Sequence, residues 1–170
     1  MYGPKGTKKC FEKMLDAFAL KNKIPINFTE IKKDSVFYEN DDFALEAAYL
    51  KHSIPCIGYR FREKDTRKVN MNYVKKFGLQ EGPIIRNLQQ GKDITFAGKK
   101  IKTKNATYLK KGKNVSFVLD TALCPACYKL GKDADVLVCE STYCEDKKDK
   151  ARAYMHLTSR QAASIAKKAR

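Results

Sequence analysis

The sequence lacks any long apolar run. No stretch approaches the ~18 to 20 apolar residues that a membrane-spanning helix needs, so we expect no membrane segment. The first ten residues, MYGPKGTKKC, also lack the apolar core of a signal peptide. The six cysteines do not suffice for the disulfide framework of a secreted domain. Together these absences predict a cytoplasmic protein whose cysteines are reduced thiols.

Apolar and aromatic residues are plentiful enough to build a core. Hydrophobic residues make up 43% of the chain, which includes nine Phe and nine Tyr. This composition argues against a disordered chain, because such chains have too little apolar surface to bury. The length of 170 residues suits one domain, or one domain with an appendage.

Positive charge is in large excess and is concentrated in the middle of the chain. The chain holds 35 Lys and Arg against 19 Asp and Glu, a net charge of +16. Residues 60–113 carry 16 basic and 4 acidic groups, whereas residues 1–59 have a net charge of +1 and residues 114–170 of +3. Such an excess points first to nucleic acid as a partner and second to an anionic membrane surface.

The basic middle third reads as an inserted arm between two parts of one core. Its glycines recur at short intervals and its apolar residues are sparse. Lysines in such an arm would bind a phosphate backbone without reading bases. An alternative is a solvated insertion whose lysines only keep it soluble. The candidate phosphate contacts are Lys99, Lys100, Lys102 and Lys104.

Hydrophobic periodicity predicts helices and strands in mixed order, which indicates a layered α/β domain. Gly3-Pro4 is expected to open the first helix, and Thr158 to Gln161 fits a capping box. A hairpin is expected around Ala97-Gly98. Helices are predicted at 6–20, 70–78, 123–130 and after 158, and strands at 24–28, 35–39, 43–49, 55–62, 115–119 and 135–139.

Ionisable residues follow several of the predicted strands. His52 lies where one strand ends in a loop, and Asp120 and Glu140 each end an apolar run. His156, the second of only two histidines, precedes the capped helix. Ligands gather at strand ends in layered α/β folds, so these four residues predict a functional site. The alternative is that each of them is structural.

Four cysteines offer a rival site. They follow the spacing C-x2-C-x11-C-x4-C, at Cys124, Cys127, Cys139 and Cys144. A structural zinc site could use all four, and the first pair could instead form a redox couple. Thiols without a shared function are the third interpretation.

Several short motifs, taken in order, resemble ribonuclease Z, the tRNA 3′-processing endonuclease of the metallo-β-lactamase fold. The resemblance runs almost from end to end of the chain and implies a partial metallo-β-lactamase-type domain. The matching segments are Tyr2 to Gly6 (YGPKG), His52 to Arg60 (the histidine loop), Leu119-Asp120-Thr121 (the family's GDT motif), Cys139-Glu140-Ser141-Thr142 (its HEAT motif) and His156-Leu157-Thr158 (its HST motif).

The resemblance implies a role for each of the four ionisable residues. His52 and Asp120 would be metal ligands, with Asp120 bridging two zinc ions or other divalent ions such as manganese. His156, oriented by Glu140, would donate a proton to the leaving 3′ oxygen. The substrate would be precursor tRNA, gripped by the basic arm, and the complete protein would be a homodimer.

The chain also departs from the family. Leu119 replaces the family's Gly, and Cys139 and Ser141 replace its His and Ala. The family's HxHxDH motif precedes the YGPKG turn, and its last histidine ligand follows the helix that here stops at Arg170. We therefore expect the central and C-proximal part of a ribonuclease Z, incomplete as a nuclease by itself. The alternatives are a non-catalytic RNA-binding module and a structural zinc protein built on the cysteines.

Overall fold

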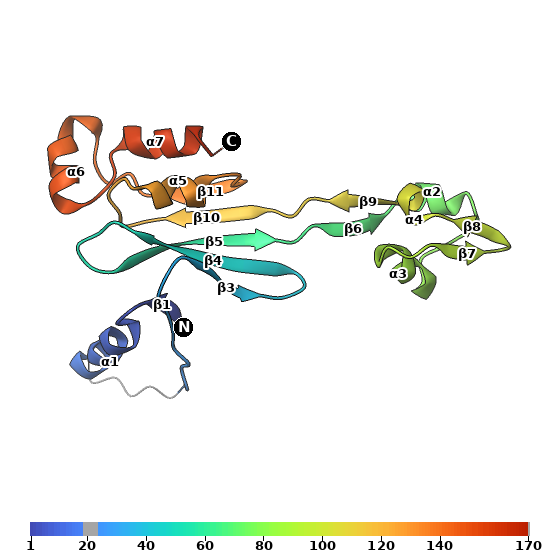
Figure 1. The fold of residues 1–170 in the computed structure, drawn as a ribbon, viewed down its shortest axis with the longest axis horizontal. Coiled ribbons are helices and arrows are strands. Elements are labelled where there is room, and N and C mark those ends of the chain that lie inside the picture. The colour runs from blue at the N-terminus through green and yellow to red at the C-terminus, as the bar shows by residue number, and fades with distance from the viewer. Residues whose placement is uncertain (19–23, 170) are drawn as a thin grey trace. The chain divides into compact units, whose positions relative to one another are not determined.

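The computed structural model describes residues 1–18 and 24–169 (Figure 1). The chain divides into two compact units. Met1–Glu63 and Lys113–Arg170 together form the first, which we call the core unit. Lys64–Gly112 forms the second, which we call the inserted unit. Its use as an arm that binds nucleic acid stays a prediction.

The core unit contains most of the secondary structure. Its strands are β1 (Tyr2–Pro4), β2 (Thr29–Ile31), β3 (Ser35–Glu39), β4 (Phe43–Leu50), β5 (Cys56–Glu63), β10 (Asn114–Val118) and β11 (Val136–Cys139). Its helices are α1 (Thr7–Ala17), α5 (Pro125–Gly131), α6 (Lys148–Tyr154) and α7 (Ser159–Lys167), with a 3-10 turn at Glu145–Lys147.

A five-stranded sheet in the order β11-β10-β5-β4-β3 organises the core unit. Only β10 and β11 run parallel, and the other neighbours are antiparallel. Helix α5 packs on one face of this sheet and α7 packs on α5 (Figure 1). Alternation along β10 follows from this arrangement, because Ser116 and Val118 are buried toward α5 whereas Phe117 between them is exposed. The buried cluster beneath the helices contains Ala48, Leu50, Val118, Cys127, Leu130, Leu157 and Ile165.

The inserted unit has its own small core. It comprises β6 (Thr66–Val69), β7 (Ile94–Phe96), β8 (Lys99–Ile101), β9 (Thr107–Lys110), α2 (Met71–Lys75), α3 (Pro83–Gln89) and α4 (Thr103–Ala106). Strands β6 and β9 pair antiparallel, as do β7 and β8. Ala97 and Gly98 join the latter pair with φ angles of 48° and 74°, so the predicted hairpin is confirmed. The four candidate lysines, Lys99, Lys100, Lys102 and Lys104, are all exposed.

Two expectations near the N-terminus are wrong. Tyr2–Pro4 is not the start of a helix but a strand that pairs in parallel with Thr29–Ile31. The strand expected at 24–28 is instead β2, which begins only at Thr29. Both errors have one cause, because a three-residue pairing between distant segments leaves no periodic signal in either. The first helix spans Thr7–Ala17, and residues 19 and 20 of the predicted range lie outside the described residues.

The other predicted elements are present, with ends shifted by a few residues. The strongest signal was the capping box, in which the Thr158 hydroxyl accepts from the Gln161 N–H and the Gln161 side chain accepts from the Thr158 N–H. The short helices α3, α4 and α6 were not predicted, because one or two helical turns are too few for a recognisable hydrophobic periodicity. In the described parts of the chain, no helix is long and apolar enough to cross a membrane.

Candidate active site

Loops at one edge of the core sheet carry the four candidate residues. Strands β10 and β11 are parallel neighbours, so Asp120 and Glu140, which follow them, emerge at the same edge. His52 lies in the turn between β4 and β5. The Ala122 N–H donates to the Lys51 carbonyl at 2.8 Å and holds that turn against the loop after β10. Strand order and loop pairing therefore bring together residues that are far apart in the sequence.

The four side chains converge within hydrogen-bonding or ion-pairing range. His52 Nε2 lies 3.4 Å from Asp120 Oδ1. His156 Nδ1 lies 3.1 Å from Glu140 Oε1 and 3.9 Å from Asp120 Oδ1. The two imidazole rings are 5.5 Å apart between centroids, with an angle of 61° between their planes. The structure thus places all four predicted residues in one site, while their individual roles stay predictions.

Glu140 is the most heavily bonded side chain of the site. Its carboxylate accepts from the Thr121 N–H at 2.6 Å, the Thr142 hydroxyl at 2.5 Å and the Leu157 N–H at 3.2 Å, and it faces His156. Burial raises the pKa of this carboxyl, but the hydrogen bonds outweigh burial and hold the pKa below its usual value. Glu140 is therefore an anion that fixes the position of the His156 ring.

Asp120 occupies an unusual backbone conformation. Its φ is +56°, in the left-handed region that residues other than glycine seldom adopt, although Asp does so more readily than most. The side chain is 53% exposed, against 13% for His52. Such conformations cluster at functional sites, where the surrounding structure imposes them. Here the turn ends β10 abruptly and leaves the carboxylate beside both histidines.

This set of donors is suited to a metal ion. Ligand atoms of His52, Asp120 and His156 all lie within 4.8 Å of one another. Imidazole nitrogens and a carboxylate oxygen are common zinc ligands, and a carboxylate that bonds a ligating histidine, as Glu140 bonds His156, commonly orients it. Within residues 1–18 and 24–169, no other group of His, Cys, Asp and Glu gathers in this way. The four cysteines that the sequence offered as an alternative zinc site are therefore not gathered as a ligand set in the described residues.

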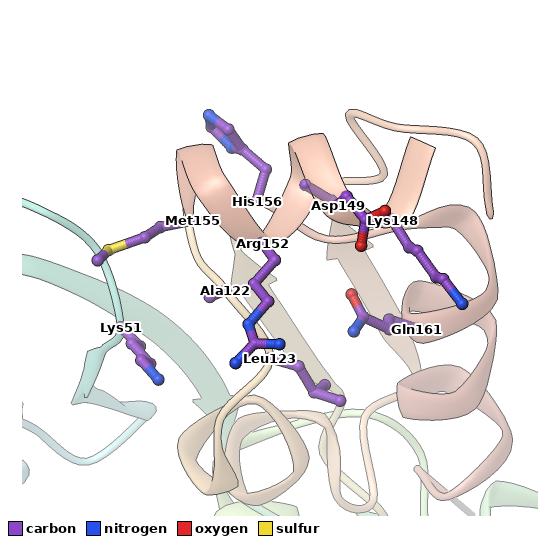
Figure 2. Close-up of a pocket in the computed structure, with 10 residues that line it drawn as sticks. Lys51, Ala122, Leu123, Lys148, Asp149, Arg152, Met155, His156 and Gln161 are labelled. Atoms are coloured by element: carbon purple, nitrogen blue, oxygen red, sulfur yellow. The ribbon is translucent and has the colours of Figure 1, made fainter. Parts of the chain in front are cut away.

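A cationic cavity adjoins the site, and the sequence analysis did not foresee it. The cavity has a volume of about 700 Å³, and His156 contributes to its wall. Lys51, Lys148 and Arg152 supply three positive charges against the single negative charge of Asp149. Figure 2 shows the Arg152 side chain directed between Lys51 and Gln161. The available sequence signal was the spacing of Lys148 and Arg152, which puts both on one face of α6.

The chain is similar in sequence to ribonuclease Z proteins over nearly its whole length. No family model matches the chain. Ribonuclease Z from Bacillus cereus (strain G9842) is 35% identical over 169 residues, which cover 98% of this chain and 55% of that protein. Ribonuclease Z from Bacillus thuringiensis (strain Al Hakam) is 34% identical with the same coverage. The chain thus spans about half the length of the curated relatives it matches.

Solved structures share the fold at lower sequence identity. Human tRNase Z, short form, superposes with a TM-score of 0.60 and 16% identity over 99% of this chain and 55% of that one. The metallo-β-lactamase fold protein YhfI from Bacillus subtilis gives a TM-score of 0.55 and 15% identity over 99% and 46%. The sheet, its helices and the site at the strand ends therefore define part of a metallo-β-lactamase fold. Within that class, the chain is a homologue of ribonuclease Z, which confirms the resemblance of its motifs.

Proposed function

We propose that this chain is the central and C-proximal part of a metal-dependent endonuclease that removes the 3′ trailer of precursor tRNA by phosphodiester hydrolysis. One observation carries the proposal: His52, Asp120, Glu140 and His156 converge at one edge of the sheet. The identity of 35% to ribonuclease Z over nearly the whole chain supports it.

His52 and Asp120 are assigned to metal binding, with zinc as the expected ion and manganese as a substitute. Bound metal ions would lower the pKa of water and stabilise the charge that develops on the phosphodiester. Asp120 has two carboxylate oxygens, so it can serve two ions at once. His52 is more deeply buried and holds its Nε2 toward Asp120.

His156 is assigned to proton donation. Its Nδ1 faces Glu140, so Nε2 is the ring nitrogen left to hold the proton that the leaving 3′ oxygen receives. The anionic Glu140 lies 3.1 Å from His156 Nδ1 and holds the ring in place for this role. His156 also belongs to the group that could hold a metal, so Glu140 would orient the ring in either role.

The inserted unit is assigned to binding the body of the tRNA. It contains 13 basic and 3 acidic side chains, and its exposed lysines suit contact with a folded RNA backbone. Within the core unit, Lys51, Lys148 and Arg152 supply further positive charge at the wall of the cavity beside His156. We expect a homodimer in the complete protein. A non-catalytic RNA-binding module is the alternative, and this charge distribution favours it equally.

Zinc binding and cleavage together test the proposal. We expect Asp120→Asn to lower zinc affinity at least about tenfold, measured by calorimetry, because one carboxylate oxygen is lost from the ligand set. Asp133→Asn is the matched control, since Asp133 also has a positive φ but lies outside the site. Equal zinc affinity in both variants would refute the metal assignment.

Cleavage of labelled precursor tRNA then separates the two functions. We expect this chain alone to cleave weakly or not at all, and robust cleavage would overturn the claim that its site is incomplete. Where cleavage is measurable, His156→Ala should lower the single-turnover rate by about 10²- to 10⁴-fold with little change in RNA affinity. Loss of RNA affinity to the same extent would refute the proton-donor role. Tight RNA binding without zinc binding would instead identify the RNA-binding module.

A further inference from the structure

The proposed nuclease site leaves one pair of thiols unused. Cys124 immediately precedes α5 and Cys127 lies in its first turn. Their sulfur atoms are 3.5 Å apart. Cys127 is fully buried in the cluster beneath the helices, whereas Cys124 is only partly buried. One thiol is therefore accessible to a reagent, and the other lies directly behind it.

Hydrogen bonds to Cys124 Sγ stabilise its thiolate form. The Cys127 thiol donates to Cys124 Sγ, and the N–H groups of Cys127 and Ala126 also donate to it, so the pKa of Cys124 falls to about 5. The same contact raises the pKa of Cys127, which keeps its proton. A partly accessible thiolate beside a buried thiol is an arrangement suited to thiol–disulfide exchange.

We propose that Cys124 and Cys127 form a reversible dithiol–disulfide couple whose oxidation acts on the loop that carries Asp120. The oxidant is a small-molecule disulfide such as glutathione disulfide. Cys124 thiolate attacks one sulfur of that disulfide and releases one glutathione thiolate. Cys127 then attacks Cys124 Sγ in the mixed disulfide, and the second glutathione leaves with the Cys127 proton. Two electrons pass from the protein dithiol to glutathione disulfide, which becomes two glutathione molecules.

Little movement is needed to form the bond. A disulfide holds its sulfurs ~2.05 Å apart, so the pair has to close by about 1.5 Å. Rotation of the partly buried Cys124 side chain can supply this movement while Cys127 stays packed. The distance between the thiols therefore favours a bond within the pair over one with the exposed Cys10 or Cys144.

Oxidation would alter the hydrogen bonds of the loop after β10. Cys127 Sγ also lies 3.9 Å from the Ala122 carbonyl oxygen, the second acceptor within reach of its single S–H, and a disulfide has no S–H for either acceptor. The Thr121 hydroxyl donates to the same carbonyl at 2.7 Å, and the Thr121 N–H donates to Glu140. Loss of the S–H donor would therefore change the hydrogen bonding of the turn that holds Asp120 beside the histidines.

Peptide mass mapping tests the couple directly. Trypsin releases residues 114–129 as one peptide, NVSFVLDTALCPACYK, which contains both thiols. After equilibration with glutathione disulfide and capping of free thiols, we expect this peptide to be uncapped and two hydrogen atoms lighter. Reduction should restore two capping groups. Two free thiols, two glutathione adducts, or a cross-link to Cys56 in the peptide 52–60 would each overturn the proposal.

Two variants and one pH profile sharpen the test. Cys124→Ser should abolish the lighter peptide, whereas the matched control Cys56→Ser, from the same cluster, should leave it unchanged. Alkylation of Cys124 should change less than about twofold between about pH 6 and about pH 8, because its thiolate is formed throughout, whereas a thiol with a pKa of ~8.5 would gain more than about tenfold. A gain of tenfold at Cys124 would contradict the proposed thiolate.

Hydrogen exchange tests the link to the loop. The Thr121 and Ala122 amides donate to Glu140 and to the Lys51 carbonyl in the reduced form. We expect their exchange rates to change at least about threefold on oxidation, since the S–H beside the Ala122 carbonyl is lost. Unchanged rates in a protein that mass mapping shows to be oxidised would overturn the link to Asp120. None of these measurements depends on nuclease activity.

Discussion

Glu140 connects three separate segments through a single carboxylate. It accepts from the Thr121 N–H in the loop after β10, from the Leu157 N–H before α7, and from Thr142 in its own loop. His156 lies against the same carboxylate. Because these donors come from three segments, Glu140 is both a structural and a functional residue, and its side chain is only 9% exposed.

Replacing Glu140 with Gln should therefore destabilise the core unit. The amide keeps one acceptor oxygen but points an N–H group at backbone N–H donors that then lack a partner. We expect the free energy of unfolding to fall by about 2 kcal/mol, measured by urea denaturation. Asp146→Asn, whose side chain is 67% exposed, is the control and should change stability by less than about 0.5 kcal/mol. Equal stability of the two variants would show that Glu140 is not required for packing.

Sequence reasoning identified the site residues better than their surroundings. His52, Asp120, Glu140 and His156 were predicted because each stands next to a recognisable strand or helix signal. The cationic cavity was missed because Lys51 and Arg152 become neighbours only after the β4–β5 turn meets the loop after β10. The spacing of Cys124 and Cys127 was visible, but the sequence could not choose between zinc, redox and unrelated thiols, because that choice depends on which ligand atoms lie nearby.

Among the secondary structure elements, the prediction succeeded where the pattern is local. Strand β4 is a mostly apolar stretch that contributes Ala48 and Leu50 to one buried cluster and Ala47 to another, and α7 begins at a capping box. It failed at β1 and β2, whose pairing is set by contacts between distant segments. The sequence likewise does not predict that α5 packs on β5, although it shows Gly58, the glycine that permits this packing.

Gly58 lies where α5 packs closely on the sheet. A Cβ at this residue would lie 2.5 Å from Leu130 Cδ1 and 2.7 Å from the Phe117 carbonyl oxygen, and the latter is backbone that cannot move aside. We expect Gly58→Ala to lower the free energy of unfolding by about 1 to 3 kcal/mol, measured by urea denaturation. Gly82→Ala is the control, because its backbone is extended and a Cβ there meets nothing within 4 Å. A neutral Gly58→Ala would contradict the close approach of α5.

At the scale of the whole molecule, the chain contains two units with separate cores and different charge. The buried cluster of the inserted unit includes Val74, Leu88 and Ile101, and that of the core unit includes Val118, Leu130 and Ile165. The inserted unit carries a net charge of +10. This charge can be counted from the sequence, but the hydrophobic cluster of the inserted unit was not predicted, because its apolar residues are widely spaced along the chain. The two properties can therefore be separated by experiment.

Replacing residues 64–112 with a two-residue Asn-Gly turn should remove RNA affinity without unfolding the core unit. The Glu63 N–H donates to the Lys113 carbonyl at 2.9 Å, and Arg62 pairs with Asn114, so a tight hairpin turn can join β5 to β10. We expect a cooperative unfolding transition by circular dichroism, because the cluster beneath α5 and α7 lies entirely within the core unit. Affinity for precursor tRNA at ~100 mM salt should fall at least about tenfold, with a shallower salt dependence.

A variant with Lys99, Lys100, Lys102 and Lys104 changed to Gln tests whether the positive charge of the inserted unit, rather than its fold, provides the RNA affinity. All four lysines are exposed, so the inserted unit should stay folded while the dependence of RNA affinity on salt concentration weakens. Each lost phosphate contact should reduce the slope of log affinity against log salt by ~0.7 to 0.9. If the turn replacement abolishes binding while the lysine variant keeps the full salt slope, the inserted unit contacts RNA through other residues. If neither change alters affinity, the inserted unit does not bind RNA, and the positive charge around Lys51 and Arg152 is then the surface to test.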